Sequence, residues 1–288
     1  MPELPEVETL KRELAKFVKD KKIKSAKVRW PKMVQPLTPL KFQNKIKNKK
    51  ITDIKRRAKM LIFELSDRNY LTVHLKMTGQ LIFQPKKGGL VFGGHPQPGG
   101  VNDLPNKFTH VIIDFTDGTN LFFNDMRKFG WMRYVDREDL YPLISHYGVE
   151  PLSKSFSLAA FELLLRLHPR RPIKKFLFDQ GLVAGLGNIY IDEACYYAKI
   201  LPTRPVGSLT KTEVKNLHQG IPEILKLSIS KKGTSFSDYV QLDGKQGQFV
   251  KWLQVYNKAG QRCQRCGTLI TKIKLNGRGT HFCPKCQK

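Results

Sequence analysis

The sequence predicts an α+β protein built from more than one domain. Three observations support this fold class. A helical stretch at the N-terminus precedes a long run of β-rich segments, helical periodicity dominates after residue 150, and four of the five cysteines lie near the C-terminus. The chain has 288 residues, and single domains usually hold ~50–200 residues, so at least two domains are expected.

The N-terminal part is predicted to be one helix followed by strands. In residues 2–19 the apolar positions Leu4, Val7, Leu10, Leu14 and Phe17 recur at helical spacing. Pro2 suits a first helical turn, where the acidic residues that follow it complement the helix dipole. Short β-rich segments come next, at 59–65, 70–75, 80–83, 110–115 and 120–123. They predict a β-sandwich or barrel, with a mobile surface loop over the Gly/Pro-rich residues 85–107.

The second part is predicted to be helical. Composition changes around residues 148–151, and helical periodicity follows at 156–167, 209–217 and 221–229. These changes predict an N-terminal domain over 1–135 and a linker over 136–150. A helical domain is expected over 151–232, and a C-terminal region over 233–288.

The charge balance of the chain predicts a polyanionic partner. Fifty-one Lys and Arg residues against 24 Asp and Glu give a net charge of +27, which indicates nucleic acid or an acidic membrane surface. A hydrophobic content of 40% excludes a disordered tail. No apolar run reaches the ~18 residues of a membrane span, and the acidic N-terminus is unlike a signal peptide. We therefore expect a soluble, intracellular protein.

The cysteine spacing predicts a zinc site. Cys263 and Cys266 form one C-x2-C pair, and Cys283 and Cys286 form a second. Each pair can present two thiolates from one tight turn, so the two hairpins are expected to close over one Zn²⁺. Zinc ribbons occur in many unrelated proteins, and this site alone does not define a function. The isolated Cys195 is expected to be a small buried side chain.

The N-terminal residues suggest a nucleophile. Methionine before proline is normally removed, which would leave Pro2 as a secondary amine able to attack an aldehyde and form an iminium. The helix N-terminus disfavours the protonated amine, and Glu3 and Glu6 are close enough in sequence to move protons. A proline followed by acids is also an ordinary helix start. The residues by themselves leave both interpretations open.

Motifs along the whole chain resemble those of the formamidopyrimidine-DNA glycosylase family. They are the opening signature Met1–Thr9, a lysine loop at Lys55–Met60, a methionine loop at His74–Gly79, an arginine/phenylalanine loop at Asn124–Gly130, a helix–two-turn–helix segment at Phe178–Glu193 and a terminal zinc finger at Gly277–Lys288. The resemblance implies a two-layer β-sandwich with a catalytic N-terminal helix, then a helix–two-turn–helix domain and a zinc finger. It implies one structural Zn²⁺ and no organic cofactor.

The resemblance also implies catalytic roles. Pro2 would attack C1′ of a damaged nucleotide, expel the base and form a Schiff base. Glu3 would donate a proton for ring opening and base release, and Glu6 would support it through hydrogen bonds. Lys59 would contact a phosphate and assist β-elimination. Arg278, between the two cysteine pairs, would bind phosphates and assist the second elimination.

Other positions are implied to contact DNA. A base extruded from a duplex leaves a gap that must be filled, and Met77, Arg127 and Phe129 match the residues that fill it. Backbone contacts are implied for Arg170, Lys174 and Asn188, although a plain helix cap also explains Asn188. Phe108 stands where family members often carry a DNA-contacting histidine, and the nearest histidine, His110, comes two residues later, which leaves that contact open. A loop over residues 231–249 is expected to cover the extruded base.

The predicted function is a bifunctional DNA glycosylase and AP lyase of base-excision repair. It would excise 8-oxoguanine and formamidopyrimidines by β,δ-elimination, as a cytoplasmic, nucleoid-associated monomer acting on damaged double-stranded DNA. The first alternative is an endonuclease VIII-like enzyme for oxidised pyrimidines, which usually carries glycine where Leu4 stands. The others are a catalytically silent DNA-binding relative and a simple zinc-ribbon nucleic-acid binder.

Overall fold

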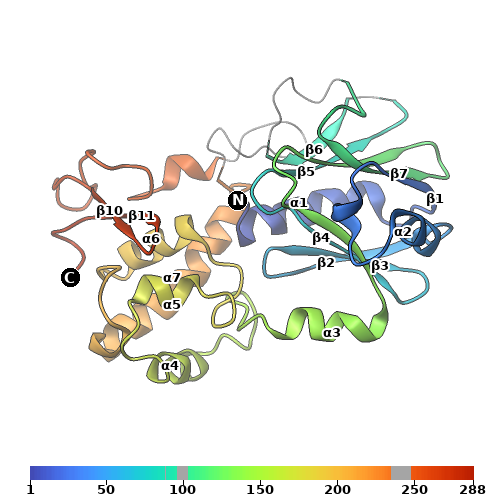
Figure 1. Ribbon diagram of the computed structural model, residues 1–288. Coiled ribbons are helices and arrows are strands. Elements are labelled where there is room, and N and C mark those ends of the chain that lie inside the picture. The colour runs from blue at the N-terminus through green and yellow to red at the C-terminus, as the bar shows by residue number, and fades with distance from the viewer. Residues whose placement is uncertain (88, 96–102, 235–247) are drawn as a thin grey trace. The chain divides into compact units, whose positions relative to one another are not determined.

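The computed structural model describes residues 1–87, 89–95, 103–234 and 248–288 (Figure 1). The chain divides into two compact units. Unit 1 comprises Met1–Ser145 with Lys231–Gln248, and unit 2 comprises His146–Ser230 with Phe249–Lys288. The residues expected to cover the extruded base fall largely outside the described ranges. Among the helices that the structure describes, none is long and apolar enough to cross a membrane.

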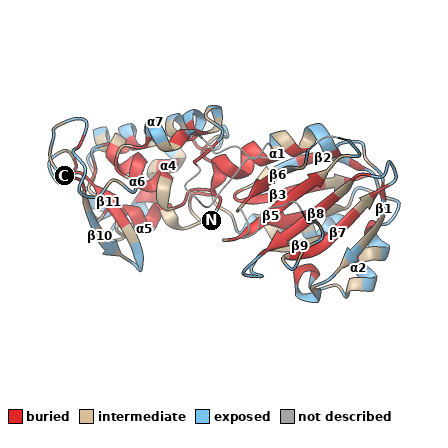
Figure 2. Cartoon of the chain, turned by 90° about the horizontal axis from the view of Figure 1, so that it is seen from above, coloured by how far each residue is buried: buried red, intermediate tan, exposed pale blue. Residues whose placement is uncertain are grey.

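Unit 1 is a two-layer sandwich of antiparallel sheets. One sheet has the order β1-β7-β8-β5-β6 and the other β2-β3-β4-β9. The strands are β1 (Ile23–Val28), β2 (Ile51–Arg57), β3 (Met60–Leu65), β4 (Tyr70–His74), β5 (Gly79–Gln84), β6 (Val91–Gly94), β7 (Thr109–Phe115), β8 (Asn120–Asp125) and β9 (Trp131–Val135). One apolar core joins both sheets to helix α1 (Leu4–Val18), through residues such as Leu10, Phe63 and Phe123. The buried residues of unit 1 follow these elements (Figure 2).

The elements predicted for the N-terminal part are present, and the structure adds several. Helix α1 and strands β3, β4, β5, β7 and β8 correspond to the predicted segments. The structure adds strands β1, β2, β6 and β9, the helices α2 (Pro39–Ile46) and α3 (Arg137–Ser145) and the short 3-10 helix η1 (Pro31–Val34). Strand β6 lies within residues 85–107, so the expectation of a loop there was wrong for Val91–Gly94, which pair with β5. Strands β1 and β2 lie at sheet edges and are rich in Lys and Arg, which weakens their β signal and suits an edge. Helix α3 fills most of the segment expected as a linker.

Unit 2 is helical and ends in a β-hairpin. Its elements are α4 (Leu158–Arg166), α5 (Ile173–Phe178), α6 (Asn188–Tyr197), η2 (Val206–Ser208), α7 (Lys211–Ser230), η3 (Phe249–Trp252), β10 (Thr271–Leu275) and β11 (Arg278–Phe282). The segments 209–217 and 221–229 form one helix rather than two, because α7 continues through Pro222. A Cβ on Gly220 would lie 2.3 Å from the Tyr197 ring, so this glycine allows α6 and α7 to pack closely. The predicted α+β class, with a β-sandwich followed by a helical part and a C-terminal hairpin, is confirmed.

Candidate active site and nucleic-acid interface

The predicted catalytic N-terminus lies at the start of α1, with Pro2 and Glu3 both buried. Glu3 is the N-cap residue, and its N–H donates a 2.9 Å hydrogen bond to Oε2 of Glu6. The other oxygen of Glu6, Oε1, accepts from the N–H of Thr234 at 2.8 Å. A single carboxylate thus joins the N-terminal turn to a residue far along the chain. Gly233, at φ +82°, allows this approach, because a Cβ there would lie 3.1 Å from Glu6 Oε1.

Lys59 lies in the turn between β2 and β3 and is buried. Ala58, just before it, has a left-handed φ of +52°. The turn is connected to α1 by Arg56, which donates from Nη1 to the Ala58 carbonyl at 2.8 Å and from Nε to Glu8 Oε2 at 3.0 Å. This ion pair fixes the position of the Lys59 turn relative to the N-terminal helix.

The charge of Glu8 is well stabilised. Burial raises the pKa of this carboxyl, but hydrogen bonds from Lys11 and Arg12 and the charge of Arg56 outweigh burial, so the pKa lies below its ordinary value. Glu8 is therefore ionised and forms ion pairs with Lys11, Arg12 and Arg56. The sequence indicated only a helix-dipole role for this residue.

The three predicted gap-filling residues lie on two neighbouring loops of unit 1. Met77 is in the turn between β4 and β5, and Arg127 and Phe129 are in the loop between β8 and β9. The Phe129 side chain is 55% exposed, and the Arg127 guanidinium lies 4.7 Å from the centre of its ring. Strands β5 and β8 pair, and the Thr78 hydroxyl hydrogen-bonds to Asp125. The structure therefore brings these loops together, as filling a single gap requires.

His110 does not replace the missing histidine at Phe108. Its side chain is buried, and Nε2 is 2.7 Å from the backbone oxygen of Asp125. Phe108 is half-buried, with the Lys107 ammonium 5.2 Å from its ring centre. The side chain of His110 therefore makes a contact within unit 1 and does not take the place of the histidine missing at position 108.

We predict that His74 makes unit 1 sensitive to acid. Burial, and then the charges of Lys76 and Lys59, lower the pKa of His74 to about 3, and its Nδ1 accepts from the Lys76 N–H at 3.0 Å. The folded state holds this imidazole neutral, whereas the unfolded chain takes up a proton below pH ~6.5. The stabilisation is therefore complete above pH ~6.5 and falls as pH decreases toward 3, by up to ~1.4 kcal/mol per pH unit.

Urea unfolding at pH 7.5 and pH 5 checks this prediction. His74→Asn keeps a hydrogen-bond acceptor and removes the titrating group, so this variant should lose less stability than the wild type between the two pH values. Equal losses in the two proteins would contradict a buried neutral His74.

In unit 2, two of the predicted DNA-binding residues hold the turn that carries Arg278. Asn188 donates from Nδ2 to the Gly279 carbonyl at 2.9 Å, and Lys174 donates from Nζ to the same oxygen at 3.2 Å. Lys174 is only 3% exposed and also binds Asp192 Oδ1 at 2.6 Å. Its ammonium is therefore committed inside the unit, and a phosphate contact by Lys174 stays a prediction.

Arg278 and Arg170 are exposed in unit 2. The Arg278 guanidinium lies 5.7 Å from the ring centre of Phe178, within the range of a cation–π contact. Arg170 lines a surface hollow together with Arg171 and Lys175. A guanidinium can bind two phosphate oxygens at once, and phosphate contacts by these two exposed arginines stay predictions.

The four paired cysteines converge as predicted. Their Sγ atoms all lie within 4.8 Å of one another, with Cys263 and Cys286 at 3.9 Å and Cys266 and Cys283 at 3.5 Å. Zinc–thiolate bonds of about 2.3 Å in a tetrahedron require sulfur–sulfur distances of about 3.8 Å, so the set fits one Zn²⁺. Hydrogen bonds from Thr268 lower the pKa of the Cys266 thiol, whereas burial raises the pKa of Cys283 and Cys286.

Helix α6 anchors the zinc finger. Glu193 accepts backbone N–H groups from residues 254, 255 and 256 at 2.8–2.9 Å. Asp192 accepts from the N–H of His281 at 2.9 Å, and the Tyr196 hydroxyl lies 3.4 Å from Cys263 Sγ. Burial raises the pKa of Glu193 despite these hydrogen bonds.

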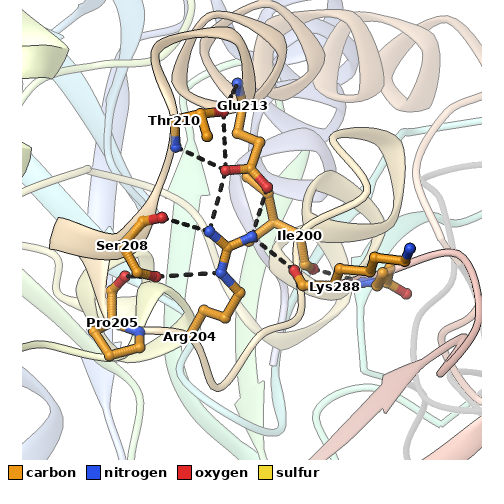
Figure 3. A network of polar contacts seen from close by, with 8 residues as sticks. Ile200, Arg204, Pro205, Ser208, Thr210, Glu213 and Lys288 are labelled. Atoms are coloured by element: carbon orange, nitrogen blue, oxygen red, sulfur yellow. Dashed lines mark hydrogen bonds and ion pairs between the residues drawn. The ribbon is translucent and has the colours of Figure 1, made fainter.

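The end of the chain is held by a second network, drawn in Figure 3. Arg204 binds both carboxylate oxygens of Glu213, at 2.5 and 3.1 Å, and the Lys288 carbonyl at 2.8 Å. Gln287 donates to the Ile200 carbonyl at 2.9 Å. The C-terminus is thereby fixed to the loop before α7, so both sides of the zinc finger are attached to the helices of unit 2.

Three family models match successive parts of the chain. Residues 1–132 match the formamidopyrimidine-DNA glycosylase N-terminal domain, 147–239 match the H2TH domain of the same enzymes, and 260–288 match the zinc finger found in FPG and IleRS. Together with the sandwich, the helical unit and the four-cysteine site, these matches define the class of zinc-finger DNA glycosylases.

Similar proteins cover the whole chain. The formamidopyrimidine-DNA glycosylase of Streptococcus pneumoniae is 41% identical and that of Shouchella clausii is 42% identical, each over 100% of this chain and 99% of the relative. A crystal structure of a Lactococcus lactis FPG variant with Fapy-dG-containing DNA has a TM-score of 0.88 at 37% identity, covering 100% of both chains. This chain belongs to the formamidopyrimidine-DNA glycosylase family, which confirms the resemblance and the predicted zinc finger.

Proposed function

We propose that this protein is a bifunctional DNA glycosylase and AP lyase that removes oxidised purines from double-stranded DNA. The observation that carries the proposal is the buried N-terminal turn, where Pro2 precedes Glu3 and Glu6 joins this turn to Thr234. With Met1 removed, the Pro2 nitrogen attacks C1′ of the damaged nucleotide and the base leaves. Glu3 donates the proton that opens the sugar ring, and Glu6 holds the turn in place.

The later steps cleave the strand on both sides of the lesion. In the open-chain iminium the proton on C2′ becomes acidic, since the cationic nitrogen accepts the electrons released when it is removed. The 3′ phosphate then leaves by β-elimination and the 5′ phosphate by δ-elimination. We assign phosphate contacts to Lys59 and Arg278, with Asn188 supporting the Arg278 turn through the Gly279 carbonyl.

We propose that the protein acts as a monomer on damaged duplex DNA in the cytoplasm, associated with the nucleoid. The net charge of +27 supports strong phosphate attraction. Binding is expected to weaken steeply with salt, because each neutralised phosphate releases counterions.

Borohydride trapping tests the proposal. The purified protein is incubated with a duplex carrying 8-oxoguanine opposite cytosine, and a covalent protein–DNA band is expected after reduction of the iminium. The undamaged duplex is the control. If no damaged duplex gives a band although mass spectrometry shows that Met1 is absent, the catalytic proposal fails and a DNA-binding role replaces it.

Oxidised pyrimidines are the second candidate substrate. A crystal structure of the Lactococcus lactis FPG, 37% identical to this chain with a TM-score of 0.86, contains DNA with an oxidised pyrimidine. Leu4 favours oxidised purines, because the enzymes for oxidised pyrimidines usually carry glycine at this position. The same trapping assay with thymine glycol or dihydrouracil separates the candidates, because a band with these lesions alone would assign the protein to pyrimidines.

Replacing Arg278 tests the phosphate contact. Arg278→Ala is expected to weaken binding to any duplex and to reduce the slope of log K against log salt by about one. The matched control is Lys285→Ala, which removes an exposed cation from the same zinc finger. Fluorescence anisotropy at several salt concentrations measures both slopes. A slope unchanged in Arg278→Ala, or equally reduced in the control, would contradict a specific role.

A further inference from the structure

Asp125, at the end of β8, is a fully buried carboxylate with every oxygen engaged. Oδ1 accepts the Thr78 hydroxyl and the Arg127 N–H, the latter at 3.1 Å. Oδ2 accepts the Gly130 N–H at 2.6 Å. The backbone oxygen of Asp125 is 2.7 Å from His110 Nε2. A group so enclosed cannot contact DNA directly, so any role it has must act through its partners.

Those partners belong to the two loops that carry the gap-filling side chains. Thr78 directly follows Met77, and the two N–H donors flank the segment that contains Phe129. The Arg127 N–H also donates to the Thr78 hydroxyl, at 3.1 Å. Thr78, Asp125 and Arg127 therefore form a closed ring of hydrogen bonds that joins one loop to the other.

The surrounding backbone is shaped to reach this carboxylate. A Cβ on Gly130 would lie 3.1 Å from Asp125 Oδ2 and 2.7 Å from the Phe123 ring. Glycine is therefore needed for the 2.6 Å hydrogen bond from its own N–H. Lys128, inside the same loop, has a left-handed φ of +59°, so this loop is both tightly bent and fixed at its ends.

We propose that Asp125 is a positioning residue that locks the loops of Met77, Arg127 and Phe129 into one rigid insert. The proposal rests on the proposed function, because it assigns the insert to filling the gap left by an extruded base. A carboxylate suits this position since it only accepts hydrogen bonds. An amide in its place would turn an NH2 group toward an N–H or hydroxyl donor.

This role predicts a defect in base extrusion and no defect in the amine chemistry. A lesion inside a duplex must leave the stack, whereas an abasic site in a single strand leaves no gap to fill. The loss of Asp125 should therefore slow excision of the lesion from duplex DNA and leave cleavage of the single-stranded abasic site unchanged. A general loss of folding would slow both.

The test compares Asp125→Asn with Asp114→Asn. Asp114 lies on β7 of the same sheet and binds Ser25 and Asn120, away from both loops. Single-turnover cleavage is measured on 8-oxoguanine in duplex and on a single-stranded abasic site, and 2-aminopurine beside the lesion reports unstacking. Asp125→Asn should slow duplex excision and unstacking about 10²-fold, since misplaced groups can cost that much, and leave abasic cleavage within about twofold. Asp114→Asn should leave both rates near wild type.

Thr78 provides a second test if Asp125→Asn does not fold. Thr78→Val removes the hydroxyl from the ring and should slow duplex excision, and Thr78→Ser should restore it. Equal slowing of both substrates, or normal duplex excision in Asp125→Asn and Thr78→Val, would overturn the proposal. If the wild-type protein acts on neither substrate, the proposed function itself has failed.

Discussion

Pro2→Gly is expected to reduce borohydride trapping on duplex DNA containing 8-oxoguanine by about 10²-fold, since a reacting group misplaced by about 1 Å can cost that much. Glycine still allows removal of Met1, but it replaces the secondary amine with a primary amine. It also removes the ring that fixes the backbone of the N-terminal residue. The remaining amine is less well positioned for attack, so both the iminium and the strand break should diminish together.

A matched control separates this effect from helix destabilisation. Pro39 is the first residue of α2, and Pro2 lies just before Glu3, the N-cap of α1; both prolines are in unit 1. Pro39→Gly makes the same change of residue next to another helix N-terminus of unit 1 and should keep trapping near the wild-type level. Equal loss in the two variants would mean that helix geometry, and not the amine, limits the reaction.

Blocking the amine gives a stricter version of the same test. Inserting a lysine between Met1 and Pro2 prevents removal of Met1 and leaves the proline nitrogen in an amide, without a reactive lone pair. Trapping should then be abolished while affinity for the lesion duplex persists. Mass spectrometry of the intact protein establishes which N-terminus each sample carries. Trapping by a chain with a blocked N-terminus would assign the iminium to another residue.

The sequence predicted those parts of the site that lie in contiguous motifs. Each of these motifs is a short run of consecutive residues. They are the two C-x2-C pairs, the turn that contains Met77 and the loop that contains Phe129. Unit 1 was recognised as β-rich from its buried strands. The edge strands β1 and β2 could not be predicted, because their lysines and arginines hide the apolar alternation.

Contacts between distant residues could not be predicted in this way. Glu6 meets Thr234, Asp125 meets Thr78, and Lys174 meets Gly279. The two residues of each pair lie far apart in the sequence, so the local pattern around either residue does not indicate its partner. Lys174 illustrates the consequence. Its charge suggested phosphate, whereas the fold places its ammonium against Asp192.

The largest structural effect is expected from loss of zinc. Cys283→Ala removes one ligand, and the core around it is small: its buried members are Tyr196, Val255, Cys263, Ile270 and Cys283. So few apolar side chains cannot hold a hairpin, and in isolated zinc-finger peptides the metal supplies ~10–16 kcal/mol. The β10–β11 hairpin should therefore unfold, which displaces Arg278 and weakens duplex binding at least about tenfold.

Zinc content and hydrogen exchange measure this outcome independently of activity. Wild-type protein should contain one zinc per chain and Cys283→Ala none, with faster amide exchange confined to the finger and the residues that α6 anchors. Cys195→Ala is the matched control, since Cys195 is equally buried but lies in α6 outside the four-cysteine set. It should keep its zinc. Slow exchange across residues 263–286 in the metal-free protein would show that the attachments to Glu193, Asp192 and Arg204 hold the finger without the metal.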